Sequence, residues 1–177
     1  MKIVNKIAPV ITVILFAFQA FSTQAANDVN INITGKVIAS PCTTINGGSA
    51  NLSVPLGDNI QAASLASPNS GTPMVKFDLP LTDCPLGTEN VKATFSGTAD
   101  GEDATLWKNV AANAATNTAV ELSDQSDSAI LSNGSTLNAA IIGGAATYKL
   151  QARAVSKTGS VIPGDISSTI VVAFEYQ

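Results

Sequence analysis

The sequence contains 177 residues with a formal net charge of −4; charged residues make up 12%, aromatic residues make up 5%, and histidine is absent. An acidic chain with so few charges offers no basic surface for nucleic acid. Without histidine a Ser-His-Asp triad is excluded, and two cysteines are too few for an ordinary structural zinc site. We therefore expect no enzyme activity, no catalytic or metal-binding residue, no cofactor, no nucleic-acid partner and no small-molecule substrate.

The first segment of the chain has the features of an export signal. Lys2 and Lys6 give it a positive start, residues 7–21 are almost entirely apolar, and residues 22–25 include small side chains suited to signal cleavage. The alternative is a membrane anchor, but a spanning helix needs about 20 apolar residues and polar residues interrupt this run early. We predict that residues 1–25 are a secretory signal peptide.

Most of the remaining chain shows short stretches in which apolar and polar side chains alternate. Alternation places one set of side chains in a core and the other in solvent, as in a half-buried β-strand. Segments rich in Gly, Asn, Asp, Ser and Pro separate the stretches, which favours a β-sandwich or barrel. The pattern predicts one all-β domain, with alternation over residues 29–33, 75–81, 91–95, 120–122, 148–154 and 170–176.

The two cysteines lie at the ends of predicted strands. Cys42 follows the strand around Val37, and Cys84 lies just past the run that begins at Val75. Export to an oxidising compartment favours a disulfide between them, which would contribute about 4 kcal/mol by restricting the unfolded chain. The alternative is a pair of buried free thiols. We predict the disulfide.

Several short motifs together carry a resemblance to a known family. The segments are residues 35–43 (GKVIASPCT), 81–85 (LTDCP), 93–97 (ATFSG) and 174–177 (FEYQ). With these motifs the chain resembles, over its whole length, fimbrial subunits of the chaperone–usher pathway, particularly the type 1 group. Family members carry a tyrosine next to last and a glycine fourteenth from the end, which correspond here to Tyr176 and Gly164.

The resemblance implies an incomplete immunoglobulin-like β-sandwich that lacks its last strand, with an N-terminal donor-strand extension. Residues 26–34 would be the arm that is lent to a neighbour, and residues 35–177 would be the fimbrial (pilin) domain. Exposed sheet edges recruit strands from other chains. The arm side chains expected to fill the neighbour's groove are Val29, Ile31 and Ile33. Alternation alone also fits an ordinary first strand of the domain's own sheet.

The acceptor groove is expected beside the last predicted strand. The resemblance assigns one wall, and contact with the chaperone, to alternate residues of that strand, with Val37 beginning the domain's first strand close by. The alternative is that the same side chains simply belong to the core. The expected wall consists of Ile170, Val172, Phe174 and Tyr176.

The resemblance also implies partners and a location. We expect neighbouring fimbrial subunits as partners, with a periplasmic chaperone and an outer-membrane usher during assembly, and export through the periplasm to the cell surface. Shaft subunits usually have a longer arm with a glycine among its alternating positions, whereas Val29 stands there in this chain. This favours a minor or adaptor subunit that contributes to adhesion. The alternatives are a major shaft pilin and a single-domain surface adhesin that binds host glycan.

Two features could support a ligand site instead. Asp100, Glu102 and Asp103 form an acidic group, and paired carboxylates can hydrolyse glycosides. Because these residues lie in a Gly-containing segment, we interpret them as a solvent-exposed turn. Trp107 could stack on a sugar, but a lone Trp in a loop more often packs onto the edge of a sandwich.

Overall fold

The structure of the chain is a computed structural model that describes residues 29–177. The predicted signal peptide and the first residues of the predicted arm, up to Asp28, lie outside the described residues. Val37–Gln177 form one compact unit, and residues 29–36 belong to a separate unit. Residues 29–36 contain no helix or strand, and Val29, Ile31 and Ile33 expose their side chains.

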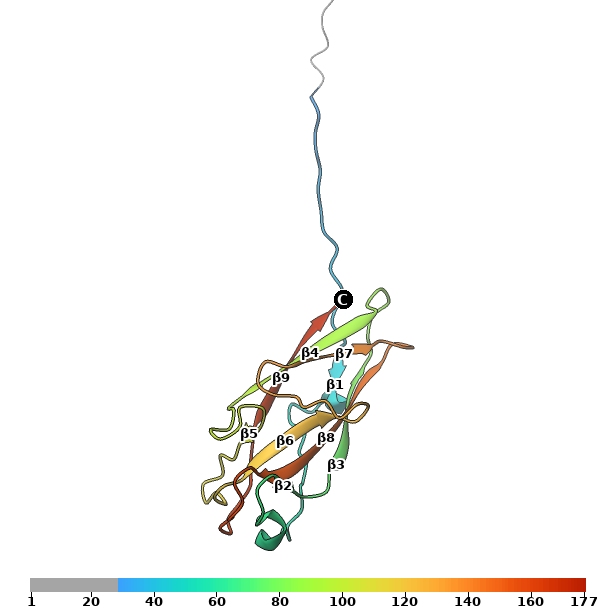
Figure 1. The fold of residues 1–177 in the computed structure, drawn as a ribbon. Helices are drawn as coiled ribbons and strands as arrows, with labels where there is room; N and C mark the ends of the chain where they lie inside the picture. Colours follow the sequence, from blue (N-terminus) through green and yellow to red (C-terminus); the bar gives the residue numbers. More distant parts are fainter. Residues whose placement is uncertain (1–28) are drawn as a thin grey trace, which may run out of the picture. The chain divides into compact units, whose positions relative to one another are not determined.

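The regular secondary structure of the Val37–Gln177 unit is almost entirely β-strand and forms two sheets (Figure 1), which confirms the all-β prediction. Every strand pair is antiparallel. The smaller sheet has the order β7-β4-β9, with β4 spanning Asn90–Gly97, β7 Thr136–Ala140 and β9 Ile170–Tyr176.

The larger sheet has the order β1-β3-β8-β6-β5, with β2 also paired to β8. Two short 3-10 turns, η1 (Asn46–Gly48) and η2 (Ala62–Leu65), lie between β1 and β2. The strand bounds are β1 Thr44–Ile45, β2 Ser70–Gly71, β3 Val75–Thr82, β5 Trp107–Lys108, β6 Ala119–Asp124 and β8 Ala146–Ser156. Within residues 29–177, no helix has the length and apolar character that crossing a membrane requires.

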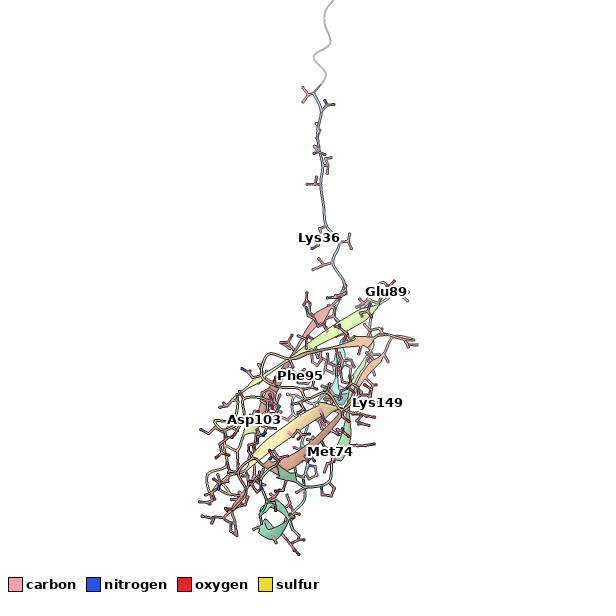
Figure 2. The ribbon with its side chains drawn as sticks, viewed as in Figure 1. Lys36, Met74, Glu89, Phe95, Asp103 and Lys149 are labelled. Carbon is pink, nitrogen blue, oxygen red and sulfur yellow. A yellow bond between two sulfur atoms is a disulfide. The ribbon has the colours of Figure 1, made fainter. Side chains whose placement is uncertain are left out.

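The core lies between the two sheets and is anchored by large aromatic side chains. Phe95 on β4, labelled in Figure 2, is fully buried, as is Trp107 on β5. The Trp107 Nε1–H donates a hydrogen bond to the carbonyl oxygen of Leu131 at 2.8 Å. Trp107 therefore packs inside the sandwich and presents no face on which a sugar could stack.

One predicted strand is buried on both faces. Residues Ala119 to Ser123 of β6 are all buried, although alternation assigned Glu121 to solvent. Glu121 instead accepts two hydrogen bonds from Arg153 on the neighbouring strand β8, at 2.8 and 3.1 Å. Taking a charged side chain out of water destabilises the fold unless a partner of opposite charge compensates for the lost hydration. The ion pair with Arg153 therefore explains how a glutamate occupies this position.

The predicted disulfide between Cys42 and Cys84 is present, and both cysteines are buried. Cys84 follows the end of β3, in agreement with its predicted place just past the alternating run that begins at Val75. Beside the disulfide, the Thr43 N–H donates to the Asp83 carbonyl oxygen at 3.3 Å. The disulfide therefore fastens the segment before β1 to the end of β3.

Gly164 lies where two loops approach each other too closely for a side chain. A Cβ at this position would come within 2.5 Å of the Ala115 amide nitrogen and 2.6 Å of the Asn113 carbonyl oxygen. Ala114 and Asp165 form a β-bridge at the same place. This crowding gives a physical reason for a glycine here.

Substituting Gly164→Ala should destabilise the domain by about 1–3 kcal/mol, because backbone atoms on both loops must shift to accept the methyl group. Gly101→Ala is the matched control, since a Cβ there meets nothing within 4 Å; its effect should stay within about 0.5 kcal/mol. Urea unfolding of the two variants measures the difference, and equal stabilities would contradict the crowding.

Candidate functional site

The last strand of the smaller sheet is hydrogen-bonded along one edge only. β9 pairs with β4 from Gly97 opposite Ile170 to Val91 opposite Tyr176. Within the Val37–Gln177 unit, no strand pairs with its other edge. Backbone N–H and C=O groups need partners when they are taken out of water, so this edge can accept a further strand.

A groove of about 1200 Å³ opens between the sheets beside β9. An empty apolar cavity of about 150 Å³ already accepts a benzene molecule, and close-packed interiors tolerate few voids. The groove is therefore large enough for several side chains from another strand. Its apolar lining from the strands includes Phe77, Leu79, Phe95, Leu122, Leu150, Val172 and Phe174.

The structure brings most of the predicted wall to the groove. Ile170, Val172 and Phe174 line it and are half-buried, whereas the intervening residues of β9 are exposed. The ring centroid of Phe174 lies 6.0 Å from that of Tyr148 in the core. Tyr176 shares the same face of β9 and packs against the core, but it lies outside the groove lining.

Val37 differs from the prediction. It is 98% exposed and belongs to no strand, and it does not line the groove, because the first strand, β1, begins only at Thr44. The segment before β1 contains Pro41, which has no N–H to donate to a ladder. Contacts such as the hydrogen bond from Thr88 Oγ1 to the Ser40 carbonyl oxygen, at 2.9 Å, hold this segment in place of a ladder.

Sequence reasoning missed a second wall of the groove. Leu52, Val54 and Leu56 line it, as do the residues of the loop 161–169 other than Ile162. Both segments lack a strand assignment. The alternation of Leu52 and Val54 continues to Leu56 across Pro55, and this longer pattern was the signal that could have revealed the wall.

Tyr148 in the core and Tyr176 on β9 differ in how their hydroxyl groups are hydrogen-bonded. The Tyr148 hydroxyl donates to the Val91 carbonyl oxygen at 2.7 Å. The Tyr176 hydroxyl is buried and makes no hydrogen bond of good geometry among the described residues, although the Cys42 backbone lies beside it and partly offsets the effect of burial on its pKa. Burial raises the pKa of both hydroxyl groups, so both stay protonated at neutral pH.

Removing each hydroxyl should therefore have opposite consequences. Tyr148→Phe breaks a buried hydrogen bond and should cost about 0.5–1.5 kcal/mol. Tyr176→Phe removes an unsatisfied polar atom and should leave stability unchanged or slightly higher. Thermal unfolding of both variants tests this, and a loss in Tyr176→Phe equal to that in Tyr148→Phe would show that the Tyr176 hydroxyl is satisfied.

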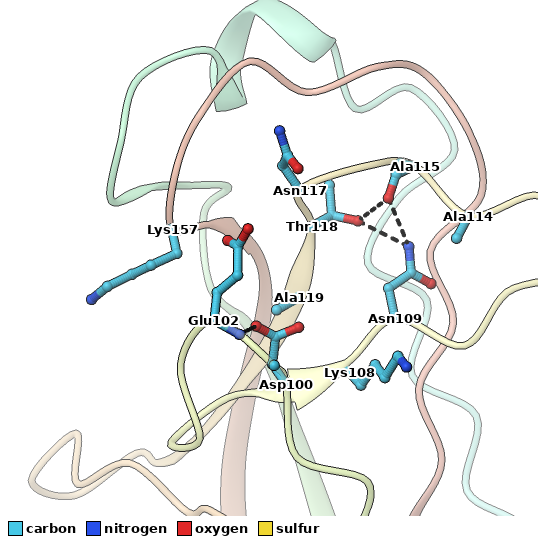
Figure 3. A pocket seen from close by; sticks show the side chains of 11 residues that line it. Asp100, Glu102, Lys108, Asn109, Ala114, Ala115, Asn117, Thr118, Ala119 and Lys157 are labelled. Carbon is cyan, nitrogen blue, oxygen red and sulfur yellow. Dashed lines mark hydrogen bonds between the residues drawn. The ribbon is translucent and has the colours of Figure 1, made fainter.

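A second, smaller pocket of about 240 Å³ lies among polar loops (Figure 3). Its most buried amide, Asn109, donates from Nδ2 to Thr118 Oγ1 at 2.9 Å and to the Asp165 carbonyl oxygen at 2.8 Å. Asp100 Oδ2 accepts from the Glu102 N–H at 2.9 Å, which closes a turn as predicted. These groups hold loops together, and among residues 29–177 no Asp, Glu and Cys cluster could bind a metal ion.

Next to this pocket, Asp103 stabilises its loop as a carboxylate. It accepts hydrogen bonds from the Thr105 hydroxyl at 2.6 Å and the Thr105 N–H at 3.0 Å. Lys157 Nζ lies 3.1 Å from its Oδ2. The hydrogen bonds from Thr105, with the Lys157 contact, lower the pKa of Asp103 to about 2.

The lowered pKa gives a pH-dependent contribution of known sign. The ionised Asp103 stabilises the fold above the ordinary aspartate pKa of about 4, and this contribution is lost as the pH falls to about 2. The stability advantage of the native chain over Asp103→Asn should therefore shrink between about pH 4 and 2. Unfolding curves across this pH range measure the difference in unfolding free energy between the two chains. A difference that does not change with pH would show that the charge of the Asp103 carboxylate does not stabilise the fold.

Comparison with known proteins agrees with this geometry. The fimbrial protein family model matches residues 31–177. The S-fimbrial adhesin protein SfaS of Escherichia coli O6:K15:H31 (strain 536 / UPEC) is 40% identical over 158 residues, covering 89% of this chain and 90% of SfaS. Protein FimG of Escherichia coli (strain K12) is 35% identical over 159 residues, covering 89% of this chain and 90% of FimG. A solved subunit of a chaperone–usher pilus matches with a TM-score of 0.63 at 17% identity, covering 86% of this chain and 97% of that chain.

The fold is thus the immunoglobulin-like sandwich of chaperone–usher pilus subunits, open beside its last strand. The chain belongs to the fimbrial protein family. Its relatives are fimbrial subunits and not enzymes, which confirms the expectation of no enzyme activity.

Proposed function

We propose that the free edge of β9 receives the N-terminal strand of a neighbouring fimbrial subunit, and that residues 26–34 are the strand this chain donates in turn. The observation that carries the proposal is the groove of about 1200 Å³ beside an unpaired strand edge. A donated strand would pair with the backbone of β9 while its alternate side chains enter the groove.

The arm has the pattern that such a groove requires. Val29, Ile31 and Ile33 alternate with polar residues, so all three can point into a groove while the polar side chains face water. Each of the three would contribute about 1.5–3 kcal/mol when fully buried. Together with a ladder of backbone hydrogen bonds, they make a stable joint between subunits.

The same geometry calls for assembly factors. An open apolar groove is a site of self-association until it is filled. A periplasmic chaperone would cover it after export directed by residues 1–25, and an outer-membrane usher would admit the subunit to the fibre. The exposed backbone edge of β9 is the surface on which such a chaperone would pair.

We place the chain among the minor or adaptor subunits, where it contributes to adhesion by holding the fibre together. The support is the short arm, in which Val29 stands where shaft subunits of the type 1 group usually have a glycine. The alternative is a major shaft pilin.

A second candidate function is a single-domain adhesin that binds host glycan. The relative SfaS is named an adhesin, and the polar pocket of about 240 Å³ is where a sugar could bind. Against it stands the burial of Trp107 and the use of Asn109 and Asp100 to hold loops. We therefore favour the building-block function.

A pair of arm substitutions tests the donor strand. Ile31→Asp places a charge on the face that enters the groove, where an unpaired carboxylate costs several kcal/mol. Asn32→Asp adds the same charge on the opposite face and is the matched control. Each chain is released from a chaperone, and the size of the resulting complexes is measured under native conditions. The Asn32→Asp chain should assemble like the native chain, whereas the Ile31→Asp chain should stay unassembled.

Synthetic peptides copying residues 26–36 extend the test to the groove. The native and Asn32→Asp peptides should raise the unfolding temperature of a chain that lacks residues 26–34, and the Ile31→Asp peptide should not. If no peptide stabilises that chain, donor-strand assembly is the wrong mechanism. Glycan binding by the armless chain would then favour the adhesin.

A further inference from the structure

One end of the sandwich exposes apolar side chains from three separate segments. Leu86 is 105% exposed in the connection from β3 to β4, Ile142 is 79% exposed in the connection from β7 to β8, and Ile38 is 74% exposed before β1. We call these three residues the collar. Single exposed apolar residues are common, but here three loops each present one at the same end.

Direct contacts tie the three collar segments together. Thr88 Oγ1 donates to the Ser40 carbonyl oxygen at 2.9 Å. The Ile141 N–H donates to the Glu89 carbonyl oxygen at 2.8 Å, and the Cys84 N–H to the Gly144 carbonyl oxygen at 3.0 Å. Glu89, labelled in Figure 2, marks this end of the unit. The collar is therefore a fixed part of the sandwich.

The collar segments themselves carry no charged side chains, and the exposed Asp83 and Glu89 lie at their borders. Residues 37–42, 84–88 and 141–146 contain no Asp, Glu, Lys or Arg. Exposed turns usually carry polar residues, whereas the centres of protein–protein interfaces are depleted of charge and enriched in large apolar groups. The composition of this end is that of a contact surface.

We propose that the collar packs against the body of the fimbrial subunit that receives this chain's arm, forming a second contact beside the donated strand. This rests on the proposed donor-strand function. Ile33, the last apolar residue of the arm, precedes Ile38 by five residues, which span at most about 18 Å. Once the arm is bound, the receiving subunit must therefore lie next to the collar.

A second copy of this chain, taken as the receiving subunit, indicates which surface the collar meets. Every strand pair in the Val37–Gln177 unit is antiparallel, so an arm that continues this pattern leaves the groove near Ile170, at the start of β9. The loop 161–169 lines the groove there, and its Ile162 is 61% exposed. A collar on one end and an exposed Ile162 on the other form a head-to-tail contact, which suits a linear fibre.

The test uses two full-length mature copies of this chain, one immobilised as acceptor and one labelled as donor, released together from a chaperone. The donor variant Leu86→Ser with Ile142→Ser should leave the acceptor at least about tenfold faster than the native donor, because interface substitutions act mainly on dissociation. Ile130→Ser is the matched control: its side chain is 46% exposed, on the loop after β6. That donor should dissociate at the native rate.

Binding of the arm peptide separates the collar from the strand. The peptide of residues 26–36 carries no collar, so it should stabilise armless chains with and without the collar substitutions equally. Equal dissociation of collar-variant and native donors would overturn the collar while leaving the donor strand intact. If neither copies nor peptide bind through the arm, the donor strand fails and the collar fails with it.

Discussion

The free edge of β9 is the constraint to which the rest of the sandwich is adapted. Within the Val37–Gln177 unit no strand pairs with this edge, and the apolar side chains of β9 that face the groove are only half-buried. A closed sandwich would gain the stabilisation from covering them within one molecule. If the proposed donor strand fills the groove, much of this stabilisation forms only between molecules, and the assembled fibre is then more stable than its separate subunits.

A groove of this size persists only if the frame around it resists collapse. Trp107 and Tyr148 tie side chains of the larger sheet to the backbone of Leu131 and Val91. Asn109 hydrogen-bonds to Thr118 and Asp165 and so connects the loops at one end of the sandwich. At the same end, Gly164 allows two backbone segments to approach closely. The disulfide fastens the other end. Rigid ends and a rigid core keep the space between the sheets available to an incoming strand.

Sequence reasoning predicted the parts of the fold that depend on alternation. The long strands β3, β4, β8 and β9 and the placement of Cys84 follow from side-chain parity. Glu121 was misassigned because alternation does not reveal that β6 is covered on both faces and that Arg153 lies beside it. Val37 was misplaced because a strand pattern does not show whether a hydrogen-bonding partner exists. The wall containing Leu56 was missed because Pro55, which donates no backbone hydrogen bond, argued against continuing the strand pattern, although the alternation runs on to Leu56.

The order of strands also affects how fast the sandwich forms. β4 pairs with β9 only after the chain has passed through β5, β6, β7 and β8, and β2 pairs with the far end of β8. Pairing strands that are distant in sequence costs loop-closure entropy before the stabilising contacts between them form. All-β folds of this kind therefore fold in milliseconds to seconds, far more slowly than helical bundles. During that interval both edges of β4 and the core side chain Phe95 are open to other chains. The window for misassembly therefore begins during folding itself, before any groove exists for a strand to fill.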